Sequence, residues 1–441
     1  MNLKRFDDII AYKSETGITA FHARNLEVAE VSEEVFNQMT LIELKSSTVP
    51  RLAAHPSLDE MESFRLLKDW NLENNPDALS GEVKFGIKSL TLNITQICNL
   101  KCTYCAAGGD GTYGEAINKV SIEKTLPQLK FFLQSLKNGS TFNLSFVGGE
   151  PFLYPEAMKV IYDYVIAEAK PRNIQCKFMV TTNGTLITDK VINMLKTMRI
   201  YITVSLDGRQ EINDVMRPSK NGKSSTEATL EGLKKLISIR DNLLSVGIAA
   251  VVTKENSNIK DNYLFFKSLD VDWCEFNYAY AERDQNTQAE YLKQMAEIVE
   301  IAWLTGGEEE LRKLRTINAY FDVLDSQQRI ENFCGAGKSY LMIDAKNRLY
   351  TCPWLVGEKD EIVGENSQLD YEKLSKYQKP LIELNNCNNC WARFVCGGGC
   401  MYVHREHTGD KHKKDEMFCE RTRGLILLAI LYYKKARASA T

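Results

Sequence analysis

The chain has 441 residues, 44% of them hydrophobic and 26% charged, which is too long for one ordinary core and sufficient for several domains. Its 55 basic and 58 acidic residues give a net charge of −3, so no broad positive field favours nucleic acid as a partner. The first residues lack the apolar stretch of a signal peptide, and the longest apolar run, Leu425–Tyr433, is too short to span a bilayer. We therefore expect a cytoplasmic protein with no membrane partner, in which that run forms a C-terminal docking helix.

Short β-rich runs open the chain, separated by turn-prone residues, at Asp8–Lys13, Ile18–His22 and Leu26–Val31. Two helix starts follow, one at Ser32 and one at the capping box Ser57–Glu60. Strands followed by helices predict a small domain over residues 1–85 that ends in a polar linker over residues 71–81. This domain carries no catalytic signature of its own.

Alternating apolar strands and amphipathic helices characterise residues 86–305. The predicted strands are Ser89–Thr95, Phe142–Val147, Cys176–Thr181, Tyr201–Leu206, Gly247–Val252 and Trp273–Tyr278, with helices that include Ser121–Lys137 and Thr226–Arg240. Six βα units predict an α/β fold, a partial (β/α)6 TIM-like barrel whose site lies at the carboxyl ends of its strands. A helical bridge over residues 306–330 and a cysteine-rich, metal-bound region over residues 331–441 complete the chain.

Twelve cysteines in a reducing compartment favour metal or redox chemistry over a disulfide framework. They fall at Cys98, Cys102 and Cys105; at Cys334 and Cys352; at Cys387, Cys390, Cys396 and Cys400; at Cys419; and, in isolation, at Cys176 and Cys274. Three thiolates in the loop after the first barrel strand suit a [4Fe–4S] cluster with one iron left open, whereas tetrahedral zinc with a distant fourth ligand is the structural alternative. The two isolated cysteines lie on predicted strands and are expected to be buried.

Polar turns follow the next three predicted strands: Gly148-Gly149-Glu150-Pro151, Thr182-Asn183-Gly184 and Ser205-Leu206-Asp207-Gly208, with Arg217 shortly after. Together with the three-cysteine loop, the first of these turns resembles the marks of the radical S-adenosylmethionine (SAM) superfamily over roughly residues 86–305. The resemblance implies that Cys98, Cys102 and Cys105 hold a [4Fe–4S] cluster, that SAM chelates its open iron, and that SAM cleavage yields a 5′-deoxyadenosyl radical.

The same resemblance implies which residues meet SAM. The Gly148–Pro151 turn, with Glu150, would meet its ammonium group, Ser205 and Arg217 its carboxylate or ribose, and Tyr104 its adenine edge. Ordinary turn formation is the alternative role for Ser205 and Asn183. The full expected set is Tyr104, Gly148, Gly149, Glu150, Pro151, Asn183, Ser205 and Arg217.

The later cysteines resemble the SPASM domain, a C-terminal extension of many radical SAM enzymes that modify peptides and proteins. The resemblance assigns Cys387, Cys390, Cys396 and Cys419 to a distal [4Fe–4S] cluster and Cys334, Cys352 and Cys400 to a nearer one. The nearer cluster is one thiolate short, because residues 327–333 contain no cysteine. Asn347 replaces an expected glycine but tolerates a left-handed turn. A zinc ribbon is the alternative for this region.

The order and length of residues 1–85 resemble the leader-recognition domain of ribosomal-peptide (RiPP) maturases, a winged-helix-like unit that binds a precursor's leader as an added strand. Enzymes of the family that mature sulfatases tend to carry an acidic residue where Pro353 stands here, and this difference argues against sulfatase maturation. We therefore predict an enzyme with SAM and three [4Fe–4S] clusters that forms an intramolecular thioether or carbon–carbon crosslink in a precursor peptide. Its electrons would come from a flavodoxin- or ferredoxin-type donor.

Two alternatives stay open at this point. The first is radical oxidation, epimerisation or excision on a protein substrate, and the second is an iron–sulfur electron carrier or scaffold without SAM chemistry. The sequence also names no catalytic residue, because His404, His407 and Tyr340 lie in the right region but such residues are more often structural.

Overall fold

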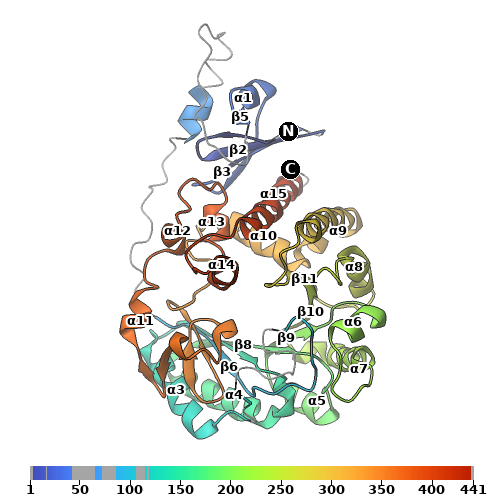
Figure 1. Ribbon diagram of the computed structural model, residues 1–441, viewed down its shortest axis with the longest axis vertical. Coiled ribbons are helices and arrows are strands. Elements are labelled where there is room, and N and C mark those ends of the chain that lie inside the picture. Colours follow the sequence, from blue (N-terminus) through green and yellow to red (C-terminus); the bar gives the residue numbers. More distant parts are fainter. Residues whose placement is uncertain are drawn as a thin grey trace.

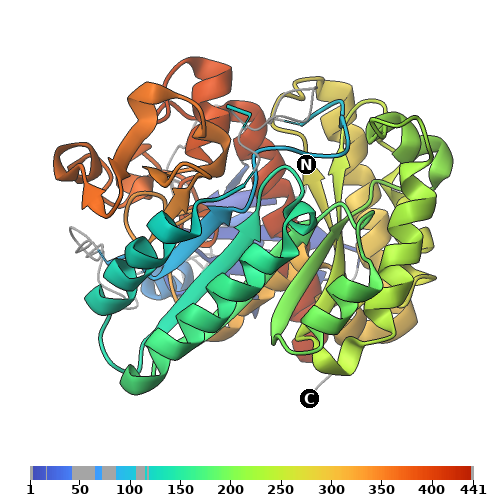
Figure 2. The same ribbon diagram turned by 90° about the horizontal axis from the view of Figure 1, so that it is seen from below.

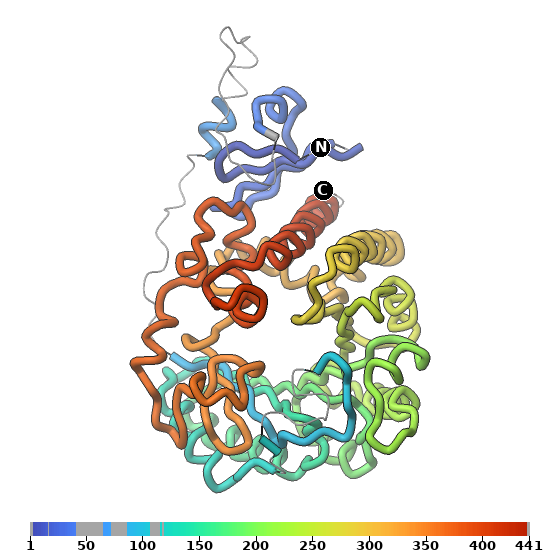
Figure 3. The backbone as a smooth tube through the Cα atoms, in the orientation of Figure 1, coloured from blue at the N-terminus to red at the C-terminus, as the bar shows by residue number. Residues whose placement is uncertain are grey.

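The computed structural model describes residues 3–15, 17–41, 65–71, 86–105, 115–116 and 119–438. The predicted capping box Ser57–Glu60 and nearly all of the predicted linker lie outside these residues. An N-terminal sheet stands at one end of the molecule and meets the C-terminal region, whereas the barrel lies at the other end (Figures 1 and 3).

The N-terminal sheet is antiparallel, with strand order β4-β3-β2-β1-β5. Its strands are β1 (Leu3–Phe6), β2 (Ile9–Ser14), β3 (Gly17–His22), β4 (Glu27–Glu30) and β5 (Thr40–Leu41). The three predicted strands are confirmed, and β1 and β5 are additional. Ser32 caps α1 (Glu33–Asn37) as predicted, since its hydroxyl accepts a hydrogen bond from the Val35 N–H at 3.4 Å.

Six parallel strands form the barrel in the order β11-β10-β9-β8-β7-β6. They are β6 (Ser89–Asn93), β7 (Thr141–Val147), β8 (Gln175–Thr182), β9 (Ile200–Ser205), β10 (Ser245–Val252) and β11 (Trp273–Tyr278). All six predicted strands are confirmed. They could be predicted because buried residues alternate with more exposed ones along a strand. In β9, Ile200, Ile202 and Val204 are buried, while the residues between them are half-buried.

Helices cover the outer face of these strands (Figure 2). They are α3 (Ile122–Ser135), α4 (Pro155–Ala169), α5 (Asp189–Leu195), α6 (Gln210–Met216), α7 (Ser225–Ile237) and α8 (Ile259–Lys267). One apolar core runs between the helices and the strands, and it includes Phe142, Leu144 and Phe146 of β7. This packing leaves the opposite face of the strands for the site, as in other barrels.

The chain beyond the barrel extends the same sheet instead of forming a separate loop-rich unit. After α9 (Gln285–Arg312) and α10 (Arg315–Ser326), β12 (Tyr340–Ile343) pairs with β6 in parallel, and β13 (Arg348–Tyr350), β14 (Ile362–Glu365) and β15 (Gln368–Leu369) follow in antiparallel order. Asn347, between β12 and β13, has a φ of 67°, so the expected left-handed turn is present.

Short helices and one long helix end the chain: α11 (Tyr371–Ser375), α12 (Leu381–Leu384), α13 (Arg393–Cys396), α14 (Met401–Thr408) and α15 (Glu416–Ala438). The apolar run Leu425–Tyr433 lies within α15, which packs on α9 and α10 and also contacts β3 and β4, so the predicted docking helix is confirmed. Within the described ranges, none of the helices combines the length and the apolar character needed to cross a membrane.

Candidate functional site

The first cysteine group lies in the segment that leaves β6. Backbone hydrogen bonds fix this segment from the far side of the barrel: the Lys101 N–H donates to the Pro218 carbonyl at 2.8 Å, and the Thr103 N–H donates to the Met216 carbonyl at 3.0 Å. The segment after β9 and α6 is therefore one wall of the loop.

The thiols of this group lie within one another's electrostatic influence. Burial, with Glu150, Cys102 and Cys105 adding to it, raises the pKa of Cys98 to about 12. Burial also raises the pKa of Cys102, with Cys105 adding to the effect and the nearby Arg217 opposing it. Three neighbouring thiols are the donor set that a cluster with an open iron requires, so the residues present fit the group.

The Gly148–Pro151 turn after β7 braces the cysteine loop from the other side. The Gly149 N–H donates to the Thr95 carbonyl at 2.9 Å, and the Glu150 N–H donates to the Ile97 carbonyl at 3.0 Å. A Cβ atom on Gly149 would lie 2.1 Å from the Ile97 carbonyl carbon and oxygen, so only glycine allows this approach. An ammonium group only donates hydrogen bonds, so at this turn it would meet carbonyl oxygens and not these N–H groups.

Glu150 is fully buried. Its carboxylate accepts hydrogen bonds from the Thr182 hydroxyl at 2.7 Å, the Asn183 N–H at 2.7 Å and the Phe152 N–H at 3.0 Å. Burial raises its pKa to about 7, although these three donors oppose the shift. Glu150 thus ties the turn after β7 to the turn after β8.

Asn183 connects the β8 turn to the cysteine loop. Its side-chain amide donates to the Asn99 Oδ1 atom at 2.8 Å and lies 3.7 Å from the Cys98 sulfur. The side-chain oxygen Oδ1 of Asn183 accepts from the Thr185 N–H and hydroxyl. The residue therefore makes a turn, which is one of the two roles considered for it, and it also contacts a cysteine.

A buried polar triad joins the segment between Cys102 and Cys105 to the turn after β9. Asp207 accepts hydrogen bonds from Arg217 Nε at 2.9 Å and Nη2 at 3.1 Å, and from the Tyr104 hydroxyl at 2.6 Å. It also accepts from the Val251 N–H at 2.8 Å. The Arg217 guanidinium stands 5.3 Å from the Tyr104 ring centroid.

Sequence reasoning missed the part played by Asp207. The Ser205–Gly208 turn contained the signal, an acidic residue at the carboxyl end of a barrel strand, but nothing in the sequence paired it with Tyr104 and Arg217. Burial alone would lower the pKa of Arg217, but the negative charge of Asp207 holds this pKa well above its usual range. The guanidinium has five N–H donors, and the pair with Asp207 uses two of them.

The other expected SAM residues lie at the same edge of the barrel. Ser205 is the last residue of β9, and Pro151 is buried as the first residue of the 3-10 helix Pro151–Leu153. The structure thus gathers the ends of β6, β7, β8 and β9 around the first cysteine group.

A second thiol group combines Cys334, Cys352 and Cys400, which are far apart in the sequence. Cys352 precedes the 3-10 helix Pro353–Leu355, and Cys400 caps α14. Burial raises the pKa of Cys352, and neighbouring Cys400 and Cys334 raise it further. Beside this group, Tyr280 after β11 packs edge-on against Trp354 and Tyr402, with ring centroids 4.8 and 5.6 Å away.

A third thiol group lies around α13. Burial, followed by Cys390, Cys419 and Cys387, raises the pKa of Cys396 to about 12, which places all four thiols near one another. The Cys390 N–H donates to the Cys387 carbonyl at 2.9 Å, forming a tight turn between the first two. The ten cysteines thus lie in three neighbourhoods, and their assignment to three clusters stays a prediction.

Across the described part of the chain, no three His, Cys, Asp or Glu side chains are arranged tightly enough to hold a single metal ion. Of the isolated cysteines, Cys274 is buried as expected, while Cys176 is only half-buried.

The three residues considered as bases have structural contacts. His404 is buried, and its Nδ1 accepts from the Asp415 N–H at 3.1 Å. His407 lies 3.2 Å from the Asp415 carboxylate and 2.7 Å from the Tyr280 carbonyl. Tyr340 begins β12 beside β6.

Comparison with known proteins agrees with this geometry. The radical SAM superfamily model matches residues 92–264. An uncharacterized protein of Methanocaldococcus jannaschii is 31% identical over 274 residues, which are 62% of this chain and 87% of that protein. The cysteine-type anaerobic sulfatase-maturating enzyme of Clostridium novyi is 26% identical over 379 residues, covering 76% and 93%. Mycofactocin maturase MftC of Mycobacterium tuberculosis is 26% identical over 344 residues, covering 71% and 78%.

Solved structures share the fold. The structure of anSMEcpe with bound AdoMet matches with a TM-score of 0.64 at 19% identity, covering 79% of this chain and 98% of that one. Streptococcus suis SuiB bound to S-adenosylmethionine matches with a TM-score of 0.51 at 15% identity, covering 94% and 100%. The predicted α/β fold class is thereby confirmed.

Proposed function

The chain belongs to the radical SAM superfamily of enzymes, and on that premise we propose that it crosslinks a ribosomally made precursor peptide. The superfamily implies SAM and a [4Fe–4S] cluster, which when bound supply a 5′-deoxyadenosyl radical that abstracts hydrogen from a C–H bond. We assign the cluster to Cys98, Cys102 and Cys105, and SAM to Tyr104, Gly148, Gly149, Glu150, Pro151, Asn183, Ser205 and Arg217.

The roles of these residues follow from their contacts. Gly149 and Glu150 fix the cysteine loop through backbone hydrogen bonds. The carbonyl oxygens of their turn would accept from the SAM ammonium, which has only donors. Asp207 holds Arg217 and Tyr104 in place, and the donors of Arg217 that Asp207 does not use suit a carboxylate. The chain thus contributes binding and orientation, whereas the cofactor contributes reactivity.

The observation that best supports a peptide substrate is the N-terminal antiparallel sheet, which precedes the barrel and takes no part in the barrel's site. Among the described strands, β4 is at one edge of this sheet, and an edge strand can pair with an extended leader. One relative is by name a maturase, the mycofactocin maturase MftC.

Crosslink formation by hydrogen abstraction is a net oxidation, so an electron must leave the product. The two further thiol groups support two auxiliary [4Fe–4S] clusters as acceptors, a nearer one on Cys334, Cys352 and Cys400 and a distal one on Cys387, Cys390, Cys396 and Cys419. We propose residues 1–85, 86–305, 306–330 and 331–441 as the domains of leader recognition, radical chemistry, helical bridge and auxiliary clusters. A flavodoxin- or ferredoxin-type protein would supply the reducing electron, and the enzyme would act in the cytoplasm.

The test is incubation of the reconstituted enzyme and SAM with the peptide encoded by the short reading frame beside its gene. We expect a product that has lost two hydrogens and whose fragmentation is interrupted between the linked residues. The Cys98→Ala, Cys102→Ala, Cys105→Ala variant is the control and should give no product. A product with normal backbone fragmentation would contradict a crosslink.

Oxidation of a single side chain in a protein is the second candidate. It is favoured by the similarity to the sulfatase-maturating enzyme, of which this chain covers 93%. A sulfatase-derived peptide with an oxidisable cysteine or serine distinguishes the two, because crosslinking predicts no turnover of that peptide.

A further inference from the structure

The N-terminal sheet docks on the segment that carries the distal thiol group. Ile10, Phe21 and Leu26 of the N-terminal domain share one apolar core with Trp391 and Phe394. The rings of Phe21 and Trp391 pack edge to face, with centroids 6.4 Å apart. In Figures 1 and 3, β3 accordingly lies next to α13 and α15, which stand between the N-terminal sheet and the barrel.

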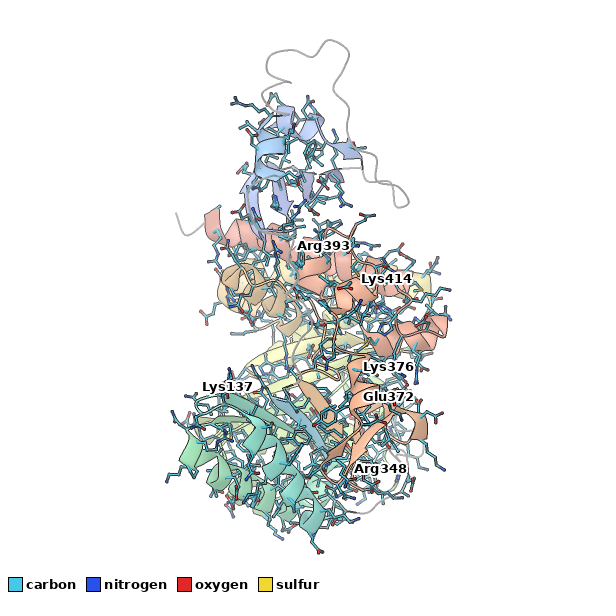
Figure 4. All side chains as sticks on the ribbon, turned by 90° about the vertical axis from the view of Figure 1, so that its left-hand side faces the viewer. Lys137, Arg348, Glu372, Lys376, Arg393 and Lys414 are labelled. Atoms are coloured by element: carbon cyan, nitrogen blue, oxygen red, sulfur yellow. The ribbon has the colours of Figure 1, made fainter. Side chains whose placement is uncertain are left out.

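A buried ion pair lies at the centre of this contact. Arg393 Nη1 donates to Asp8 Oδ1 at 2.7 Å, and only 8% and 5% of the two side chains are exposed. Figure 4 shows Arg393 at the junction between the N-terminal sheet and the rest of the molecule. The same Nη1 atom donates to the Cys390 carbonyl at 3.1 Å, so Arg393 touches both the sheet and a cysteine of the distal group.

Asp8 is held in place on its own side of the contact. Arg24 pairs with the second carboxylate oxygen of Asp8. The backbone N–H of Asp8 donates to Asn71 Oδ1 at 3.3 Å. Burial alone would raise the pKa of Asp8, but hydrogen bonds and charges from Arg393 and Arg24 lower it below its usual value. Asp8 is therefore a fixed negative charge at neutral pH.

Two further hydrogen bonds join the N-terminal domain to the rest of the chain near this contact, one of them to the cysteine segment. Arg5 Nη1 donates to the Asn389 carbonyl at 2.7 Å, and Arg329 Nε donates to the Arg24 carbonyl at 2.8 Å. Together with Arg393, the contacts of the N-terminal domain cover the turn between Cys387 and Cys396. Cys387 is only 6% exposed, which is consistent with this cover.

We propose that Asp8 is a positioning residue for the distal iron–sulfur site, acting through Arg393, and that the N-terminal sheet is the outer wall of that site. The inference rests on the proposed function to the extent that the distal thiols hold a cluster. Net charge, hydrogen bonding and solvent exposure set the reduction potential of such a cluster. Asp8 affects the net charge near the cluster by balancing Arg393. The N-terminal sheet affects its solvent exposure by excluding water.

The experiment is a redox titration of full-length, reconstituted protein followed by electron paramagnetic resonance. The signal that is absent from a Cys387→Ala variant identifies the distal cluster. Asp8→Asn removes a negative charge and should shift its midpoint potential upward, whereas Arg393→Met removes a positive charge and should shift it downward. Asp8→Glu keeps the charge and should keep the potential. The matched control is Glu30→Gln, which breaks an ion pair between the N-terminal domain and Lys434 of α15 and should cause no shift.

Opposite shifts in the two charge variants support the proposal, because simple loosening of the contact would shift both potentials in one direction. Shifts of the same sign in Asp8→Asn and Arg393→Met would overturn the proposal while leaving the cluster assignment intact. So would midpoint potentials of these two variants that equal that of Glu30→Gln. A wild-type protein that has no signal dependent on Cys387 would instead overturn the three-cluster proposal, and this inference with it.

Discussion

Asp207→Asn tests whether the triad of Asp207, Arg217 and Tyr104 organises the cofactor site. The change keeps the size of the side chain but replaces a carboxylate oxygen, on which only donors converge, by an amide N–H2 group. Arg217 would then be a buried charge without its partner. Only 9% of its side chain is exposed, so solvent screens little of the loss. Removing one partner of a buried pair costs about 3–5 kcal/mol.

For a domain of this size, each kcal/mol lowers the melting temperature by about 2–4 °C, so the expected loss is roughly 6–20 °C. Differential scanning calorimetry of the reconstituted protein measures it, and SAM affinity by equilibrium binding should fall in parallel. The control is Asp163→Asn, which breaks the exposed pair of Asp163 with Lys159 and should cost under about 1 kcal/mol. If the Asp207→Asn and Asp163→Asn variants had the same melting temperature, and Asp207→Asn bound SAM with wild-type affinity, the triad would have no organising role.

Four other changes test separate parts of the proposal. Replacing Cys98, Cys102 and Cys105 with alanine should lower the iron content from about twelve to about eight per chain and abolish SAM cleavage, and retained cleavage would reject the assignment. Deleting residues 1–85 should greatly weaken turnover of the full precursor while SAM cleavage without peptide continues; unchanged turnover would reject leader docking. Glu150 has a pKa of about 7 in the fold against a usual 4.5, so its ionisation opposes folding, and wild type should lose stability relative to Glu150→Gln as the pH rises through this range. Melting temperatures at about pH 5 and about pH 8 measure this difference, at most about 3 kcal/mol, and parallel curves would contradict it. A cysteine-containing precursor should alter the auxiliary-cluster resonance spectrum because the nearer cluster lacks a fourth thiolate, whereas its cysteine-to-serine version should not; identical spectra with a sulfur-free crosslink would favour carbon–carbon bond formation.

The barrel could be predicted because its information is local. Each of its strands shows a short-range burial pattern, and each turn residue of the site follows directly after a strand. The strands β12 to β15 could not be predicted in this way. β12 has four residues and acquires its place by pairing with β6, about 250 residues earlier in the chain, a contact that no local pattern indicates.

The same limit explains what was missed at the sites. Asp207 acquires its role from Tyr104, which is 103 residues away, and Asp8 from Arg393, which is 385 residues away. A resemblance to known motifs identifies cysteine ligands because their spacing is itself the signal. It does not identify the acidic residue that fixes an arginine, since that pairing exists only once the chain has folded.

The two buried aspartate–arginine pairs perform related work at different thiol groups. Arg217 opposes the rise in the pKa of Cys102, and Lys414, followed by Arg393, opposes that of Cys387, because a nearby positive charge favours the thiolate. An unpaired arginine would be costly to bury, and a flexible one would not hold its charge at a fixed distance from the sulfur. Asp207 and Asp8 meet both requirements, each accepting hydrogen bonds from its arginine and from a second cation or hydroxyl. Buried ion pairs contribute little net stability compared with apolar packing, so their placement beside cysteines is better explained by the tuning of those thiolates than by the stability of the fold.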